Sequence, residues 1–227
     1  MEKVAALLIA AHAIGDFALQ PDWLAVRKRE SVWLLLHAAI QGLLAYAVLQ
    51  AWTCWQAPVA VLVTHAVIDW IKLRLPDTAK WFTIDQIVHV ILLLLIGWWL
   101  VESGILPKFN GIGYKPIVFV GGLIFTMLGT GFLVGKFTQR MIEENKLQID
   151  GLVGGGKWIG RFERALIFTL IFIDQPTGIG FLVAAKSILR FEEARQQKLA
   201  EYVLIGTLLS FSLAITVASI TKWAINL

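Results

Sequence analysis

The chain has 227 residues, of which 58% are hydrophobic and 16% are charged, and its mean hydropathy is +0.73. Soluble domains carry roughly 25% charged residues, so this composition excludes a water-soluble globular protein and indicates an integral membrane protein. The formal net charge of +4 comes from a few basic loops. It therefore indicates membrane orientation rather than binding to nucleic acid, and no nucleic-acid partner is expected.

Apolar segments long enough to cross a bilayer as helices recur along the whole chain. The alternating ten-residue strands of an outer-membrane barrel are not recognisable, so an all-α, polytopic membrane protein is expected. The single cysteine, Cys54, excludes an intramolecular disulfide. Eight transmembrane helices are predicted at about residues 3–20, 31–51, 57–74, 79–101, 116–139, 160–174, 177–195 and 198–224.

Basic residues gather in alternate connecting segments. They follow the first, third, fifth and seventh predicted helices, whereas the loops at 53–57 and 174–177 contain none. By the positive-inside bias, the basic segments are cytoplasmic and both termini lie outside. The first apolar segment is predicted to be a retained helix rather than a signal peptide, because His12 and Asp16 interrupt its apolar core.

One short motif occurs twice in the first half of the chain. His12 and Asp16, four residues apart in the first predicted helix, return as His65 and Asp69 in the third, with an offset of 53 residues. A spacing of four places both side chains on one face of a helix. A fixed offset of this kind predicts a duplicated helical hairpin.

The two remaining histidines follow the same repeat. His37 and His89 lie in the second and fourth predicted helices, 52 residues apart. Counted from the cytoplasmic helix ends, the four histidines fall within roughly 6 Å of one another in depth. Ionisable groups inside spans usually face the bundle interior, so a four-helix bundle with a buried metal site is expected. The predicted ligands are His12, Asp16, His37, His65, Asp69 and His89.

Imidazole and carboxylate ligands together suit zinc, manganese or iron, bound as one or two divalent ions. Asp85 has no counterpart in the first repeat, where Trp33 takes its place. It is therefore the candidate general base. Gln20 and Gln86 lie near the cytoplasmic mouth and are candidate substrate-binding residues. A structural polar network or a proton or ion pathway remains the alternative interpretation of these groups.

The second half has no histidine, and the predicted division is into residues 1–104, a metal-binding half, and 105–227, a packing half that faces an anion. Gly131 and Gly135 form a G-x-x-x-G that favours close helix packing. Basic residues near the cytoplasmic surface form either salt bridges, with Glu163 or Glu201 as partners of Lys186, or a pocket for an anionic substrate. The candidates for that pocket are Arg161, Arg164, Lys186 and Arg190.

Several segments of the chain resemble a bacterial inner-membrane family catalogued as domain of unknown function 3307. They are residues 12–20, 155–164, 184–191 and 201–202. The resemblance implies a bacterial inner-membrane location and supplies no activity. The His-x-x-x-Asp pairs also look like those of the inner-membrane metal-dependent hydrolases, a similarity confined to short patterns in the first half.

The leading functional hypothesis is a metal-dependent hydrolase or phosphotransferase that acts at the cytoplasmic leaflet on a lipid-linked or otherwise anionic substrate. The metal would make a bound water acidic enough to act as the nucleophile. Two hypotheses from other classes stay open: a proton or metal-ion transporter or channel, and a membrane anchor or accessory subunit of a larger complex. The expected surroundings are membrane lipid, and homo-oligomerisation is left open.

Overall fold

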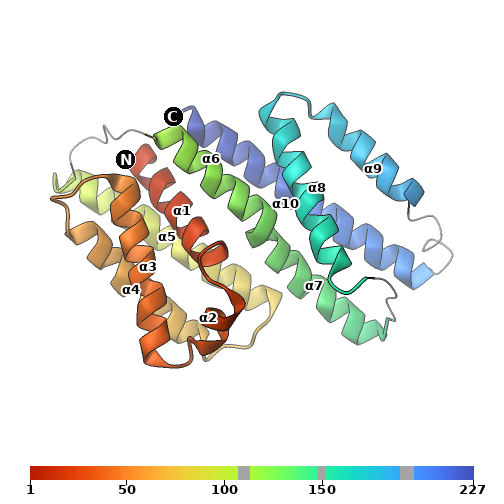
Figure 1. Ribbon diagram of the computed structural model, residues 1–227, viewed down its shortest axis with the longest axis horizontal. Coiled ribbons are helices and arrows are strands. Elements are labelled where there is room, and N and C mark those ends of the chain that lie inside the picture. The colour runs from red at the N-terminus through yellow and green to blue at the C-terminus, as the bar shows by residue number, and fades with distance from the viewer. Residues whose placement is uncertain (107–112, 148–151, 190–196) are drawn as a thin grey trace. The chain divides into compact units, whose positions relative to one another are not determined.

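The computed structural model describes residues 1–106, 113–147, 152–189 and 197–227, and within these ranges it contains helices and no β-strand (Figure 1). The all-α prediction is therefore confirmed. The helices are α1 Glu2–Phe17, α2 Asp22–Arg27, α3 Ser31–Leu49, α4 Gln56–Lys72, α5 Ala79–Glu102, α6 Tyr114–Ile124, the π-helix η1 Phe125–Gly129, α7 Thr130–Asn145, α8 Gly155–Phe172, α9 Thr177–Leu189 and α10 Gln197–Ile225.

Each of the eight predicted helices is present near its expected position. The helix expected at 116–139 is longer, because α6, η1 and α7 form one helix from Tyr114 to Asn145. The helix expected at 177–195 is described as far as Leu189, and the remainder lies outside the described residues. The short helix α2 is an addition to the predicted set. Pro21 precedes it with φ −66°, a backbone angle suited to a helix start.

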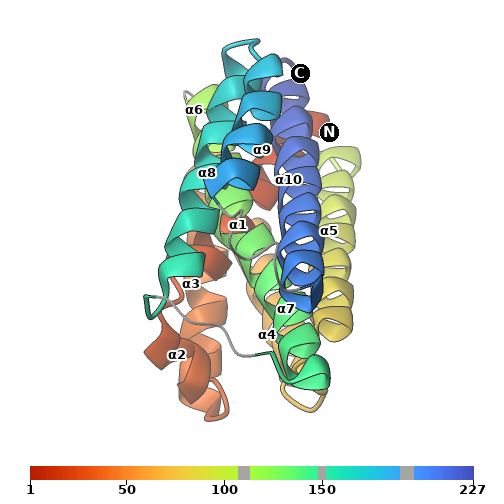
Figure 2. The same cartoon turned by 90° about the vertical axis from the view of Figure 1, so that its right-hand side faces the viewer.

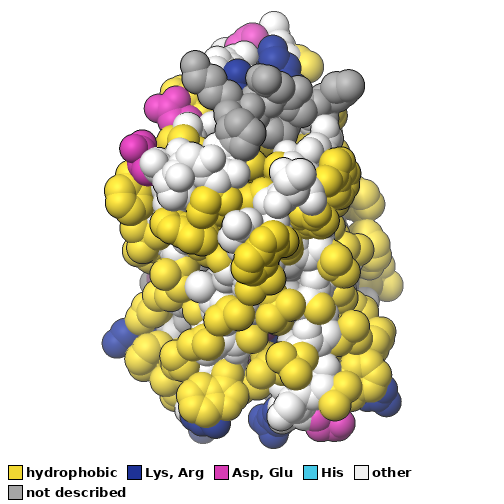
Figure 3. Space-filling view, turned by 90° about the vertical axis from the view of Figure 1, so that its left-hand side faces the viewer, with side chains coloured by type: hydrophobic (Ala, Val, Ile, Leu, Met, Phe, Trp, Pro, Cys, Tyr) yellow, Lys and Arg dark blue, Asp and Glu magenta, His cyan; other side chains and the backbone are white. Residues whose placement is uncertain are grey.

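Four helices are long and apolar enough to cross a membrane, judged by length and composition. They are α3, α5, the helix 114–145 and α10. The other long helices in the described ranges are shorter or more charged, since α1 and α4 have 16 and 17 residues and α8 carries four Lys, Arg and Glu side chains. Figure 3 shows one face of the molecule on which hydrophobic side chains form a broad band, with charged side chains at both ends. These features support a membrane protein with four clear spans.

The chain divides into two compact units, residues 1–124 with 223–227, and residues 125–222. The boundary lies at the start of η1, whereas the predicted division is at residue 104. Helix α6 belongs to the first unit because it packs on α1, where Gly121 contacts Ala10. The C-terminal residues join the same unit, since the Tyr114 hydroxyl donates a hydrogen bond to the Ala224 carbonyl at 2.7 Å.

Four helices of the first unit form a closed ring, in which α1 and α4 each contact both α3 and α5. Successive long helices of the ring run in opposite directions (Figures 1 and 2). The C-terminal halves of α1 and α4 therefore lie beside the N-terminal halves of α3 and α5. Apolar side chains such as Leu7, Leu8, Val61, Leu93 and Leu100 fill the opposite end of the ring.

In the second unit a buried arginine stabilises the π-helical turn. A π-helix departs from the regular backbone hydrogen-bond pattern. Arg164 supplies two donors to the Met127 carbonyl, from Nε at 3.2 Å and Nη2 at 2.8 Å. Gly131 provides the room, because a Cβ there would lie 2.5 Å from Arg164 Nη2, whereas a Cβ on Gly135 would meet open space. Gly131 thus accommodates a side chain, which is a different role from the predicted G-x-x-x-G helix contact.

Substituting Gly121 by alanine tests the contact between α1 and α6. A Cβ at this position would lie 2.6 Å from the Ala10 Cβ and 2.7 Å from its Cα, so the helices must separate. We expect Gly121→Ala to lower the free energy of unfolding by about 1–3 kcal/mol. The matched control is Gly97→Ala, also in a buried helical position of the first unit, where the nearest atoms are 3.6 Å away. Thermal unfolding in detergent measures both, and equal effects would contradict the predicted contact.

Candidate metal centre

The four histidines converge inside the ring of the first unit. His12 comes from α1, His37 from α3, His65 from α4 and His89 from α5, and all four are buried. The centre of the His65 ring lies 4.4 Å from that of His89, 4.9 Å from that of His37 and 5.5 Å from that of His12. The expectation that these side chains face the bundle interior is therefore met.

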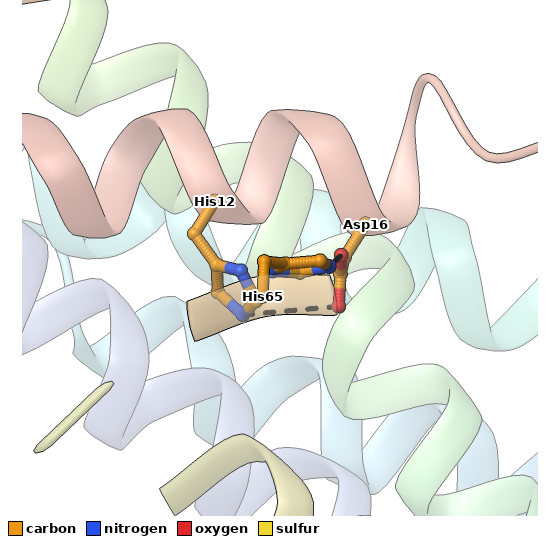
Figure 4. Close-up of side chains that lie close together, drawn as sticks. All are labelled: His12, Asp16 and His65. Carbon is orange, nitrogen blue, oxygen red and sulfur yellow. Dashed lines mark ion pairs between the residues drawn. The ribbon is translucent and has the colours of Figure 1, made fainter. Parts of the chain in front are cut away.

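Two aspartates lie among the rings. Figure 4 shows Asp16 on α1 approaching both His12 and His65, the latter from α4. Asp69, one turn after His65 on α4, places Oδ2 3.6 Å from His65 Nε2 and 3.7 Å from His37 Nε2. The four-residue spacing in both helices is thus what brings each carboxylate to the rings.

Four of these ligand atoms form a compact set that we call the quartet: His37 Nε2, His65 Nε2, Asp16 Oδ1 and Asp69 Oδ2. The two nitrogens are 3.0 Å apart, and Asp16 Oδ1 lies 3.1 Å from His37 Nε2 and 3.4 Å from His65 Nε2. With the two Asp69 distances, five separations lie between 3.0 and 3.7 Å. A tetrahedral ion with bonds of about 2.0–2.1 Å has ligand atoms about 3.3 Å apart. Five of the six separations in the quartet therefore match the spacing of ligand atoms around a small divalent cation, and two nitrogens with two oxygens suit such an ion.

Asp16 is held in place by two amides. Gln41 Nε2 donates to Asp16 Oδ1 at 2.6 Å, and Gln86 Nε2 donates to Asp16 Oδ2 at 3.4 Å. Gln41 is a residue that sequence reasoning missed. Its signal is the spacing on α3, since Gln41 follows His37 by four residues as Asp16 follows His12. Hydrogen bonds of this kind fix the orientation of a carboxylate ligand.

Asp69 is neutralised by a lysine from outside the ring. Lys28 Nζ donates to Asp69 Oδ2 at 2.7 Å and to Gln20 Oε1 at 2.9 Å, and Lys28 is only 7% exposed. In the sequence Lys28 belongs to a basic triplet of the kind that orients membrane helices. The structure instead buries it, because α2 ends at Arg27 and Lys28 caps it next to the site. The side-chain oxygen of Gln20, a predicted substrate-binding residue, therefore accepts a hydrogen bond from Lys28.

A second group of residues lies beside the quartet. Asp85 on α5 accepts hydrogen bonds at Oδ2 from Lys72 Nζ and from Gln86 Nε2, the latter at 3.1 Å. His89, one turn further along α5, places Nδ1 2.9 Å from the backbone carbonyl of Asp85. Lys72 ends α4, three residues after Asp69, and this i, i+3 spacing is the signal that could have identified it.

The charges of this region do not cancel. Three buried or nearly buried carboxylates, on Asp16, Asp69 and Asp85, face the ammonium groups of Lys28 and Lys72 within the described residues. One negative charge remains if the imidazoles are neutral. Since an uncompensated charge in an apolar interior is costly, the site favours a further cation such as a metal ion.

A small cavity borders the rings on the apolar side. It is lined by His12, His65, His89 and Gln41 together with apolar residues that include Leu8 and Leu93. Its size suits about one water molecule. Beyond it lie the packed apolar residues of the ring, so the polar groups occupy one end of the bundle only.

The predicted basic pocket lies in the second unit and is largely engaged in other contacts. Lys186 Nζ forms a salt bridge with Glu163 Oε2 at 2.8 Å, as the salt-bridge alternative predicts. Arg164 is buried against Met127 and Ser210, and the Arg161 guanidinium lies 4.9 Å from the centre of the Trp158 ring. Arg190 lies outside the described residues. These contacts favour the salt-bridge interpretation of the cluster.

One family model matches the part of the chain that holds the site. Residues 4–109, which include all four histidines, match the model of a family described as "Protein of unknown function (DUF3307)". Neither a curated protein nor a solved structure matches the chain.

The ion pair of Lys28 and Asp69 predicts a large effect on stability. Lys28→Met leaves the Asp69 carboxylate buried without its ammonium partner, and we expect the free energy of unfolding to fall by about 3–5 kcal/mol. Denaturant unfolding in the presence of a chelator measures this without compensation from bound metal. The control is Arg29→Met, at an exposed position of the same triplet, which should change stability by no more than about 0.5 kcal/mol. A Lys28→Met effect as small as that of the control would show that the pair contributes little.

Proposed function

Since residues 4–109 match a family model whose description assigns no activity, we propose a function from the site alone. The protein is a membrane-embedded, metal-dependent hydrolase or phosphotransferase that acts at the cytoplasmic leaflet on a lipid-linked or otherwise anionic substrate. The observation that carries the proposal is the quartet, two imidazole nitrogens and two carboxylate oxygens from three helices, in which five of the six separations are 3.0 to 3.7 Å.

The residues divide into ligands and supporting groups. His37, His65, Asp16 and Asp69 would hold one divalent ion, and the mixed nitrogen and oxygen donors suit zinc, manganese or iron. Such an ion would act as a Lewis acid toward a substrate oxygen or a water molecule. Gln41 and Gln86 fix the orientation of the Asp16 carboxylate, and Lys28 fixes that of Asp69.

Asp85 is the candidate general base in this proposal. Its Oδ1 atom is buried and has no hydrogen-bond partner among the described residues, so it can accept a proton. Its Oδ2 atom is engaged by Lys72 and Gln86. Asp85 lies one turn from His89 in the same polar end of the bundle, where a substrate that reaches the quartet would also lie.

We further propose that all eight long helices cross the bacterial inner membrane, with both termini outside. Helices α1 and α4 are about 24 and 26 Å long, close to the ~30 Å apolar core of a bilayer. They pack in one ring with α3 and α5, which are long enough to span, so they would occupy the same depth. The two His-x-x-x-Asp pairs, on α1 and α4, support an origin by duplication of a hairpin.

A proton or ion pathway uses the same residues in a different way. It requires a polar route through the other end of the ring, where buried side chains such as Leu7, Leu8 and Leu100 are packed together. This packing favours a site that opens to one side only. Proton flux through liposomes that is present in the natural protein and absent in His12→Ala would instead favour the pathway. A role as an anchor or accessory subunit does not explain why four buried histidines converge.

Metal content tests the centre directly. We expect the purified protein to retain about one equivalent of zinc, manganese or iron, and His37→Ala or His65→Ala to weaken its binding by about tenfold or more. The control is Cys54→Ala, which removes a buried potential ligand outside the cluster. Elemental analysis after gel filtration measures the content. Metal retained equally by all variants, or absent from the natural protein even after reconstitution, would contradict the proposal.

Hydrolysis of phosphate esters tests the chemistry. We expect metal-reconstituted protein in nanodiscs to release p-nitrophenol from p-nitrophenyl phosphate or bis(p-nitrophenyl) phosphate, with loss of activity in chelator. Asp85→Asn should reduce the rate while leaving the bound metal in place, because Asp85 lies outside the quartet. Equal rates for His65→Ala and the Cys54→Ala control would remove phosphoester hydrolysis as the activity.

A further inference from the structure

Asp69, a member of the quartet, and two residues beside the quartet offer ligand atoms that it does not use. One ligand atom from each of Asp69, Asp85 and His89 lies within 4.8 Å of those of the other two. All three residues are buried. Asp69 Oδ1, Asp85 Oδ1 and His89 Nε2 have no hydrogen-bond partner among the described residues. Buried polar atoms are rarely left this way, so three of them in one cluster indicate a missing ligand.

The protonation of His89 follows from its neighbour. Its Nδ1 lies 2.9 Å from the Asp85 carbonyl oxygen, and a carbonyl only accepts hydrogen bonds. Nδ1 therefore carries the proton, and in the neutral ring Nε2 keeps its lone pair. A ring nitrogen prepared in this way by a carbonyl on its other side is the usual form of a histidine metal ligand.

Lys72 already places a positive charge at this cluster. Its Nζ forms a salt bridge with Asp85 Oδ2, and the Lys72 side chain is 32% exposed whereas that of Asp85 is 4% exposed. The lysine reaches the carboxylate from the end of α4, with Nζ 5.5 Å from the centre of the Phe82 ring. A flexible side chain that is partly in solvent can leave without exposing the interior of the bundle.

We propose that Asp69, Asp85 and His89 form a second divalent-cation site, and that the Lys72 ammonium occupies it in competition with the ion. Asp69 links the two sites, because Oδ2 belongs to the quartet and Oδ1 is free. This inference rests on the metal centre of the proposed function. When the second ion is bound, Lys72 turns to solvent and Asp85 is a ligand rather than a base. The protein thus changes between a one-metal and a two-metal centre.

The first experiment removes the competing charge. Equilibrium dialysis with Mn²⁺, followed by elemental analysis, measures how many ions bind and how tightly. We expect Lys72→Met to bind the second ion about tenfold tighter or more than the natural protein, because the Asp85 carboxylate loses its only described ammonium partner. Lys80→Met, which removes an exposed lysine two residues into α5, should bind as the natural protein does. Adding Asp85→Asn to Lys72→Met should abolish the gain.

The second experiment uses the natural protein and does not depend on the folding of a variant. When Mn²⁺ fills the second site, it displaces the Lys72 amine from Asp85 and makes it more accessible. The rate of reductive methylation of Lys72 should therefore rise with Mn²⁺ binding. The rate at Lys80 should stay constant. An unchanged Lys72 rate, or a Lys72→Met variant that binds the second ion no tighter, overturns the inference. If instead His65→Ala leaves the binding of every ion unchanged, the metal centre of the proposed function is wrong.

Discussion

The buried carboxylate of Asp69 contacts both a lysine and two histidines of the polar cluster. It is neutralised by Lys28 at 2.7 Å and lies within 3.7 Å of two histidine rings. A carboxylate in an apolar bundle costs several kcal/mol unless it is paired and hydrogen-bonded. Lys28, buried at the end of α2, meets this requirement. The same requirement explains why the polar groups cluster, since isolated charges would be far more costly.

The antiparallel packing of α1, α3, α4 and α5 in a ring places that cluster at one end of the bundle. Because neighbouring helices run in opposite directions, residues late in α1 and α4 meet residues early in α3 and α5. The apolar residues at the other end, such as Leu8 and Leu100, then form a continuous core. The polar cluster therefore occupies one end of the ring only.

Much of this arrangement could be predicted from spacing along the chain. The helices, the inward orientation of the four histidines and the pairing of His12 with Asp16 follow from helical periodicity, which is local. The roles of Lys28 and Gln41 did not follow, because each reaches a carboxylate more than twenty residues away in sequence. The contact of Arg164 did not follow either, since no sequence pattern predicts that it donates to the carbonyl of Met127 in the π-helix.

The amino-acid sequence by itself determined the helical class, the position of the long helices and the set of residues that face the interior, because hydrophobicity and the 3.6-residue period act within each helix. Only the tertiary structure decided which charges are compensated, which ligand atoms stay free and where the chain divides into units. Those properties depend on distances between segments remote in sequence, and in a low-dielectric interior a shift of a few ångströms decides whether an ion pair forms.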